Sequence, residues 1–304
     1  MRKAFSDALL RIALDDPRIL LLTGDHGYAL FDEFRQRCPD QYINAGIAEQ
    51  NMVGMAAGLA RVGFRPFVYG LSAFIPIRTI EQIKLDIAHD NLGVVLLGDG
   101  AGFVYSHLGT SHQSTEDIAC TRAIPGLEVL SPADRFEMTA AMERAHAASG
   151  PVYLRMGKSD RGDVHPGQIG ALSPGRLLKV RSGRSDRPAL LATGSMVRTA
   201  LEIAQDQDFS VWSVPSLKPI SAEDVLEAAC ASSGLVTLEE HSVLGGLGAA
   251  ITEIVSESMP IRVLRIGVPD RFSEHCGTYN YLLKEHGLDQ VTIKRKIDEF
   301  ITSF

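Results

Sequence analysis

The sequence predicts an α/β protein with two doubly wound domains, in which parallel sheets carry helices on both faces. Apolar runs of strand length alternate with helical stretches of about ten to fifteen residues, a pattern typical of parallel sheets. The length of 304 residues exceeds one ordinary domain of about 100–200 residues. An interval rich in Gly, Pro, Ser and Arg interrupts the alternation. We therefore expect a first domain at residues 1–160, a linker at 161–187 and a smaller second domain at 188–304.

The first domain is expected to begin with a helix, because apolar residues from Phe5 to Ala13 follow helical spacing until Pro17 ends the pattern. Ile19–Leu22 is an apolar run with the length of a buried strand. By the same criteria of period, length and flanking Gly or Pro, we expect further strands at 41–44, 66–69, 94–97, 128–131 and 151–155. The expected helices lie at 48–60, 77–88, 114–121 and 133–147.

The linker has no sustained periodicity, and we expect one short hairpin in it, near 177–180. From Pro188 the alternation of strands and helices resumes. The expected strands lie at 189–192, 210–214, 235–238 and 262–265. The expected helices lie near 196–205, 222–231, 247–258 and 279–286.

The composition is that of an ordinary globular protein, with 45% hydrophobic and 22% charged residues. A formal net charge of -7 argues against a nucleic-acid partner, which usually needs a basic surface. The longest apolar runs, such as Ile19–Leu22, are too short to span a membrane. The four cysteines form no Cys-x-x-Cys pair, and no apolar leader precedes the first helix. We therefore expect a cytoplasmic protein with no zinc site.

Glu49 stands out because it falls in the first turn of an expected helix among the apolar residues Ile47, Met52 and Val53. A carboxylate at a helix start commonly does no more than complement the helix dipole. Apolar neighbours suggest instead a carboxyl group near a buried surface, where desolvation helps it to hold a proton. Both interpretations are open from the sequence.

Aromatic residues gather where the strand at 66–69 ends, with Tyr69 and Phe74 preceding Arg78. Such residues often only fill the core at a strand end. Alternatively, they offer an aromatic face on which a planar heterocycle stacks.

Three further segments could carry chemistry. A glycine-containing loop delivers His112 just before a helix, with His107 nearby, although both could be surface residues. Arg155 ends a strand, where it could grip an anion bidentately or simply cap the sheet edge. The segment Glu239–Gly248 leads from a strand into a Gly-rich helix start, which could be a phosphate cradle, a tight packing turn or a subunit contact.

Together and in this order, these motifs resemble the transketolase superfamily over nearly the whole chain. Ile47–Gln50 is similar to the cofactor-activating glutamate motif of transketolases and deoxyxylulose-phosphate synthases. Thr110–Gln113 resembles the active-site Thr-His-Gln loop of that family. Glu239–His241, with the glycines of 245–248, resembles the start of the C-terminal domain signature. The resemblance implies a pyrimidine-binding domain for thiamine diphosphate, followed by a smaller transketolase C-terminal domain.

The resemblance also implies roles for single residues. Glu49 would bond to the aminopyrimidine ring and favour the imino form that removes the thiazolium proton. His112 would bond to substrate hydroxyls or shuttle protons. The implied cofactor contacts are Ile47, Glu49, Tyr69, Phe74 and Arg78, and the implied substrate contacts are Asp25, His107, His112 and Arg155.

Two departures from the family pattern put ordinary sugar-phosphate substrates in doubt. Phe5 stands where transketolases have a serine that contacts the sugar phosphate, and Asp99–Ala101 stands where they have a second histidine. Arg155 does match the family arginine that binds the anionic end of the substrate.

The resemblance leaves no site for the cofactor's diphosphate and Mg²⁺ in this chain. Gly98–Gly100 is similar to the start of the family's magnesium motif, but the expected Asn is missing from 127–136, so we interpret it as a turn. Full-length transketolases bind Mg²⁺ and the diphosphate in an N-terminal domain, which this sequence does not contain. We therefore expect a separate diphosphate-binding subunit that binds Mg²⁺, a cofactor shared between the two chains, and an α2β2 assembly.

The leading functional prediction is transfer of a two-carbon ketol unit from a ketose to an aldose or related acceptor. One alternative is the beta subunit of a 2-oxoacid dehydrogenase, which passes an acyl unit to a lipoyl or carrier domain. Another is a structural subunit without activity. The sequence leaves the donor and acceptor open.

Overall fold

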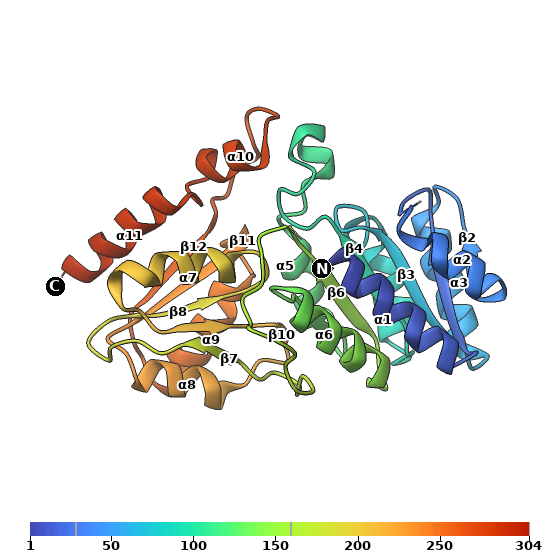
Figure 1. The fold of residues 1–304 in the computed structure, drawn as a ribbon, viewed down its shortest axis with the longest axis horizontal. Coiled ribbons are helices and arrows are strands. Elements are labelled where there is room, and N and C mark those ends of the chain that lie inside the picture. The colour runs from blue at the N-terminus through green and yellow to red at the C-terminus, as the bar shows by residue number, and fades with distance from the viewer. Residues whose placement is uncertain (28, 159, 304) are drawn as a thin grey trace.

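Two twisted sheets, each flanked by helices, stand side by side in the computed structural model of the chain (Figure 1). The structure describes residues 1–27, 29–158 and 160–303. None of the helices in these ranges combines the length and apolar character needed to cross a bilayer.

The first sheet has seven strands in the order β10-β5-β6-β4-β3-β1-β2. All neighbours are parallel except β10, which pairs antiparallel with β5. The carboxyl ends of its parallel strands therefore meet at one edge, where ligands of such sheets usually bind. The strands are β1 Ile19–Thr23, β2 Tyr42–Asn44, β3 Arg65–Leu71, β4 Val95–Asp99, β5 Glu128–Leu130, β6 Val152–Met156 and β10 Ser216–Lys218.

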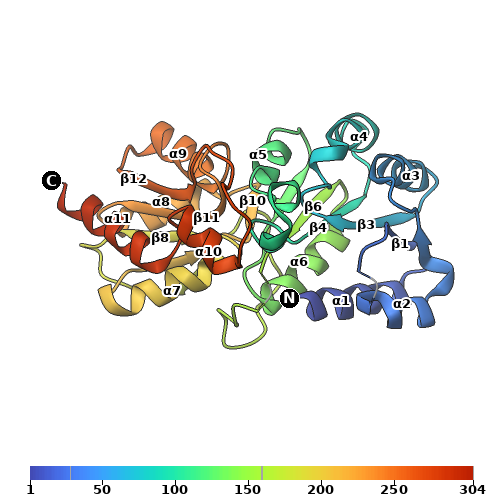
Figure 2. The same cartoon turned by 90° about the horizontal axis from the view of Figure 1, so that it is seen from above.

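Helices cover both faces of this sheet, with α1, α2 and α6 on one side and α3, α4 and α5 on the other (Figure 2). Side chains alternate between the two faces along each strand. In β3, Phe67 packs in the core beneath α1, while its neighbour Val68 packs with Met52 of α3. The helices are α1 Arg2–Asp15, α2 Asp32–Arg37, α3 Glu49–Arg61, α4 Ile80–Gln82 with its continuation Ile83–Ala88, α5 Asp117–Arg122 and α6 Arg135–Ala147.

The second sheet has the order β12-β11-β8-β9-β7, parallel apart from the pair β7 and β9. Its strands are β7 Leu178–Arg181, β8 Ala189–Ala192, β9 Val211–Ser213, β11 Leu235–Ser242 and β12 Val263–Val268. Its helices are α7 Met196–Gln207, α8 Ala222–Cys230, α9 Leu247–Ser258, α10 Tyr279–Glu285 and α11 Gln290–Thr302.

The fold class is confirmed, although both sheets carry one antiparallel edge strand that the sequence pattern did not predict. The predicted hairpin near 177–180 is wrong, because β7 pairs with β9 instead of with an adjacent segment. The helices α2 and α11 and the strand β10 were not predicted. Strand β10 is only three residues long and pairs with a strand of the other sheet region, so no local periodicity could indicate it.

The segment after β6 is tied to α6 by His165. Its Nε2 lies 2.8 Å from Oε1 of the fully buried Glu137, and Asp134 accepts hydrogen bonds from the backbone N–H groups of Val164 and His165. Burial alone lowers the pKa of His165, but the hydrogen bond to Glu137 and the charges of Glu137 and Asp134 raise it overall. The protonated imidazole is therefore the form that the folded protein favours.

This ion pair predicts a loss of stability as the pH rises. The free energy that protonated His165 contributes is fully present below its unfolded pKa of about 6.5 and is lost as the pH rises through its raised folded pKa. Urea unfolding of wild type and His165→Ala between pH 5.5 and 8.5, values within roughly a unit or two of that reference, should show the dependence in wild type alone. The exposed His89 supplies the control, since His89→Ala should leave the wild-type dependence in place.

Candidate functional site

Glu49 begins α3 with only 6% of its surface exposed. Its Oε2 accepts a hydrogen bond at 2.8 Å from Nη1 of Arg78, which follows the loop after β3. Gln50, the next residue along, donates from Nε2 to the Arg78 carbonyl oxygen at 3.1 Å. The structure therefore joins the predicted helix-start carboxyl directly to the segment that follows β3.

Phe74 lies at the centre of this region. The Arg78 guanidinium carbon stands 4.2 Å above its ring centroid. The imidazole ring of His112 lies 5.3 Å from the Phe74 ring and that of His26 lies 6.1 Å away, both in edge geometry. We call these five residues, Glu49, Phe74, Arg78, His112 and His26, the ring cluster.

His26 was not among the sequence candidates. It directly follows Asp25 after the carboxyl end of β1, and its position there is the signal that could have identified it, because β1 neighbours β3 in the sheet. Within the described part of the chain, Nε2 of His26 is buried and lacks a hydrogen-bond partner. An unpaired buried nitrogen beside an aromatic ring is typical of a site that a ligand completes.

The ring cluster fits a flat heterocycle with a hydrogen-bonding nitrogen. The planar guanidinium of Arg78 already lies over Phe74 and bonds to Glu49, which shows that a flat group can contact both at once. Arg78 is 46% exposed and can turn away, whereas Glu49 is held at the start of α3. A buried carboxyl next to an aromatic face is also the donor set that an aminopyrimidine ring requires.

Comparison with known families decides what this site belongs to. The family model for the transketolase pyrimidine-binding domain matches residues 1–162, and the model for the transketolase C-terminal domain matches residues 178–293. The chain belongs to the transketolase family. It is thus a transketolase-type subunit, in which the ring cluster lies in the pyrimidine-binding domain.

Similar proteins extend over nearly the same length as this transketolase chain. One of the two kinds of subunit of the apulose-4-phosphate transketolase of Phocaeicola vulgatus is 34% identical, covering 99% of this chain and 97% of that protein. The 6-deoxy-6-sulfo-D-fructose transketolase subunit SqwH of a Clostridium species is 34% identical, covering 98% and 94%. A solved structure described as a split gene transketolase, inactive beta4 tetramer, superposes with a TM-score of 0.89 at 34% identity and covers 99% and 97%.

The structure corrects the prediction that Tyr69 contacts the cofactor. Its ring is fully buried, stacks on Phe5 at 5.8 Å and meets the edge of Phe31 at 4.9 Å. Its hydroxyl donates to Asp99 at 2.7 Å, and burial together with the Asp99 charge raises the pKa of Tyr69 far above its usual value. Tyr69 faces α1 and belongs to the core of the transketolase pyrimidine-binding domain.

Arg155 is a second correction. Its guanidinium is 2% exposed, donates from Nε to Asp117 at 2.8 Å, and donates from Nη2 to the Glu240 carbonyl of β11 at 2.8 Å. Tyr153 also donates to Asp117, at 2.8 Å. The side chain points from the end of β6 toward the second sheet, so it is enclosed and does not face a substrate.

The other predicted contacts lie outside the ring cluster. Ile47 is 73% exposed, and Asp25 and His107 are also exposed. Among the described residues, no hydrogen bond, ion pair or ring contact joins these three to Glu49 or Phe74. They remain predictions.

The phosphate-cradle interpretation of the Gly-rich segment is wrong. The carboxylate of Glu239 accepts hydrogen bonds from the backbone N–H groups of Leu247 at 2.7 Å and Gly248 at 2.8 Å. It therefore occupies the N-terminus of α9, where a phosphate would have to bind. A Cβ on Gly246 would lie 1.9 Å from Glu239 Oε2, so the glycine is required for this tight packing turn.

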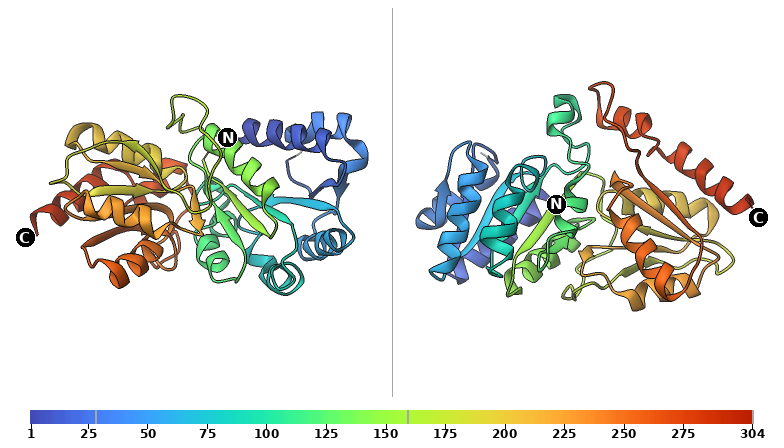
Figure 3. Two further views of the ribbon diagram at one scale, coloured as in Figure 1. Left: turned by 90° about the horizontal axis from the view of Figure 1, so that it is seen from below. Right: turned by 180° about the vertical axis from the view of Figure 1, so that it is seen from behind.

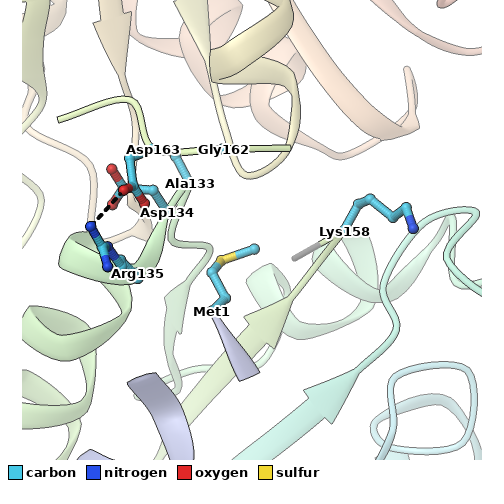
Figure 4. Close-up of a pocket in the computed structure, with 7 residues that line it drawn as sticks. All are labelled: Met1, Ala133, Asp134, Arg135, Lys158, Gly162 and Asp163. Carbon is cyan, nitrogen blue, oxygen red and sulfur yellow. Dashed lines mark ion pairs between the residues drawn. The ribbon is translucent and has the colours of Figure 1, made fainter. Parts of the chain in front are cut away.

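A separate hollow of about 240 Å³ lies beside Met1, between α6 and the segment after β6 (Figure 4). It shares no residue with the ring cluster. Its acidic and basic groups are engaged with one another, since Arg135 pairs with Asp163 at 2.9 Å and Asp134 caps α6. We assign no chemistry to it.

Proposed function

We propose that this chain is the C-terminal subunit of a split transketolase. With a separate diphosphate-binding subunit, it would transfer a two-carbon ketol unit from a ketose donor to an aldose or related acceptor. The ring cluster carries this proposal, because it sets a buried carboxyl group beside an aromatic face and two imidazoles. The two similar subunits, which cover the same length, support it.

Thiamine diphosphate would supply the thiazolium carbon that carries the ketol unit. Phe74 would pack against the aminopyrimidine, and Glu49 would bond to its ring nitrogen. Glu49 is suited to this task because the start of α3 fixes its position and burial excludes water from it. Arg78 would leave the Phe74 face as the cofactor enters.

His112 and His26 would act on substrate oxygens at the edge of the same ring. His112 Nδ1 lies 3.0 Å from the Ser111 hydroxyl, which helps to orient the imidazole. His26 has its buried Nε2 available. Two imidazoles on one aromatic ring can hold or move protons in the pH range where enzymes work.

The partner subunit would bind Mg²⁺ and the diphosphate, and two copies of each chain would form a cytoplasmic α2β2 assembly. Asp99 of the Gly-Asp-Gly turn is already bonded to Arg2 and Tyr69, which supports its interpretation as a turn. Exposed apolar side chains next to the ring cluster support a covering chain. They are Ile47 at 73%, Ile80 at 36% and Leu85 at 51% exposure.

This arrangement predicts weak cofactor binding by the isolated chain. Calorimetric titration with thiamine diphosphate and Mg²⁺ should give little heat for the chain alone and a clear saturating transition after mixing with the co-purified partner. Half of the contacts, including those to the diphosphate, would come from the partner. Tight binding by the isolated chain would contradict the shared site.

The donor class can be tested on the same mixture. The two similar subunits are named for ketoses with a phosphate or sulfo group, so phosphorylated and sulfonated ketoses form the first panel. A panel of 2-oxoacids tests the dehydrogenase alternative. Turnover of 2-oxoacids with a lipoyl acceptor, and of no ketose, would overturn the ketol-transfer proposal.

A further inference from the structure

We propose that the second domain positions the catalytic loop, and that Glu240 is the positioning residue through which it does so. The loop is the segment 100–116, which carries His112 and is called the His112 loop below. This inference rests on the role proposed for His112. In space, the loop stands against α10 and the chain that precedes it (Figures 1 and 3).

Glu240 belongs to β11 and is 2% exposed, yet every bond of its carboxylate is directed out of its own strand. Oε1 accepts a hydrogen bond from the backbone N–H of Phe103 at 2.7 Å. Oε2 accepts from the Ser195 hydroxyl at 2.5 Å and from the Tyr279 hydroxyl. A buried carboxylate is tolerated only when its lone pairs are satisfied, and here the loop supplies one of the three donors.

The contact between Glu240 and the loop is close enough to restrict the sequence. A Cβ on Gly102 would lie 2.3 Å from Glu240 Oε1, so only glycine lets the loop backbone reach the carboxylate. Gly100, Gly102 and Gly109 all have positive φ values, of 79°, 68° and 82°. Glycines leave a backbone conformationally free, so this loop needs external contacts to hold one arrangement.

A second contact reaches the residue next to His112. The Ser273 hydroxyl, which precedes α10, donates to Gln113 Oε1 at 2.8 Å. Because Ser273 donates there, it accepts from His286 Nε2 at 2.9 Å. The ring of His286 also stacks on Phe103 at 4.9 Å with an interplanar angle of 16°. The second domain therefore contacts the loop on both sides of His112.

Glu239 provides a matched comparison within the same strand. Both carboxylates are buried, but successive side chains of a strand point to opposite faces. Glu239 binds the start of α9 inside its own domain, whereas Glu240 binds the His112 loop of the other. Loss of either should destabilise the chain, and only loss of Glu240 should release the loop.

Amide hydrogen exchange of the full-length chain, read by mass spectrometry, tests the proposal. In Glu240→Ala, peptides from 102–116 should exchange about tenfold faster or more, since the Phe103 N–H loses its acceptor. Glu240→Gln keeps an acceptor oxygen and should restore most of the protection. Glu239→Ala should speed exchange at the start of α9 and leave 102–116 as in wild type. If Glu240→Ala yields no folded protein, Ser273→Ala tests the second contact by the same readout.

Unchanged exchange of 102–116 in both Glu240→Ala and Ser273→Ala would overturn the proposal, as would equal loosening of the loop by Glu239→Ala. With the partner subunit, Glu240→Ala should lower kcat while the half-saturating concentration of thiamine diphosphate stays constant. Glu240→Gln should recover kcat. If the wild-type mixture turns over no ketose, the proposed function fails, while the exchange data still decide whether Glu240 holds the loop.

Discussion

Replacement of Glu49 by Gln is expected to abolish ketol transfer by the reconstituted enzyme while the chain stays folded. Gln has the size of Glu and can still accept from Arg78, but it cannot exchange a proton with the aminopyrimidine. General acid–base groups contribute about 10²–10⁴-fold to rate, so kcat should fall by at least about 10²-fold. Steady-state assays at saturating thiamine diphosphate, with circular dichroism and urea unfolding of each variant, measure both parts of the prediction.

Glu81→Gln is the matched control for Glu49, because it makes the same chemical change on an exposed residue of α4. It should keep wild-type kcat and stability. Glu49→Ala should be as inactive as Glu49→Gln. Near-wild-type turnover in either Glu49 variant would refute the assigned role.

Arg155→Met is expected to act on stability and not on substrate affinity. The change removes the guanidinium and leaves Asp117 buried with its negative charge uncompensated. Breaking one partner of a buried ion pair typically costs about 3–5 kcal/mol, a large share of the total stability of a domain. Urea unfolding of the full chain should therefore show a strongly lowered midpoint.

Two comparisons isolate the cause. Arg11→Met breaks the exposed pair with Glu143 and should cost less than about 1 kcal/mol. The double variant Asp117→Asn with Arg155→Met leaves no buried charge and keeps an acceptor for Tyr153, so it should recover part of the loss. An Arg155→Met chain with wild-type stability and a raised donor KM would reinstate the substrate-binding role.

Sequence patterns predicted the strand and helix alternation well because burial imposes it locally. Ile19–Leu22 and Val94–Leu97 are apolar throughout, as strands covered on both faces must be. The helices α2 and α11 are exposed on much of their surface and leave a weaker pattern. The error over Tyr69 arose at a strand end, where alternation places it on the α1 face although Phe74 lies only five residues further along.

The amino-acid order by itself determined the family, the fold class and the pairing of a helix-start carboxyl with an aromatic segment, because these depend on local periodicity and on motifs of adjacent residues. Tertiary structure alone decided which side chains meet. It placed His26 beside Phe74, enclosed Arg155 between the sheets, and seated Glu239 and Glu240 against different domains. The physical reason is that direction and burial arise from packing between segments distant in the chain, and a side chain's surroundings decide whether its charge is available for chemistry or is neutralised within the fold.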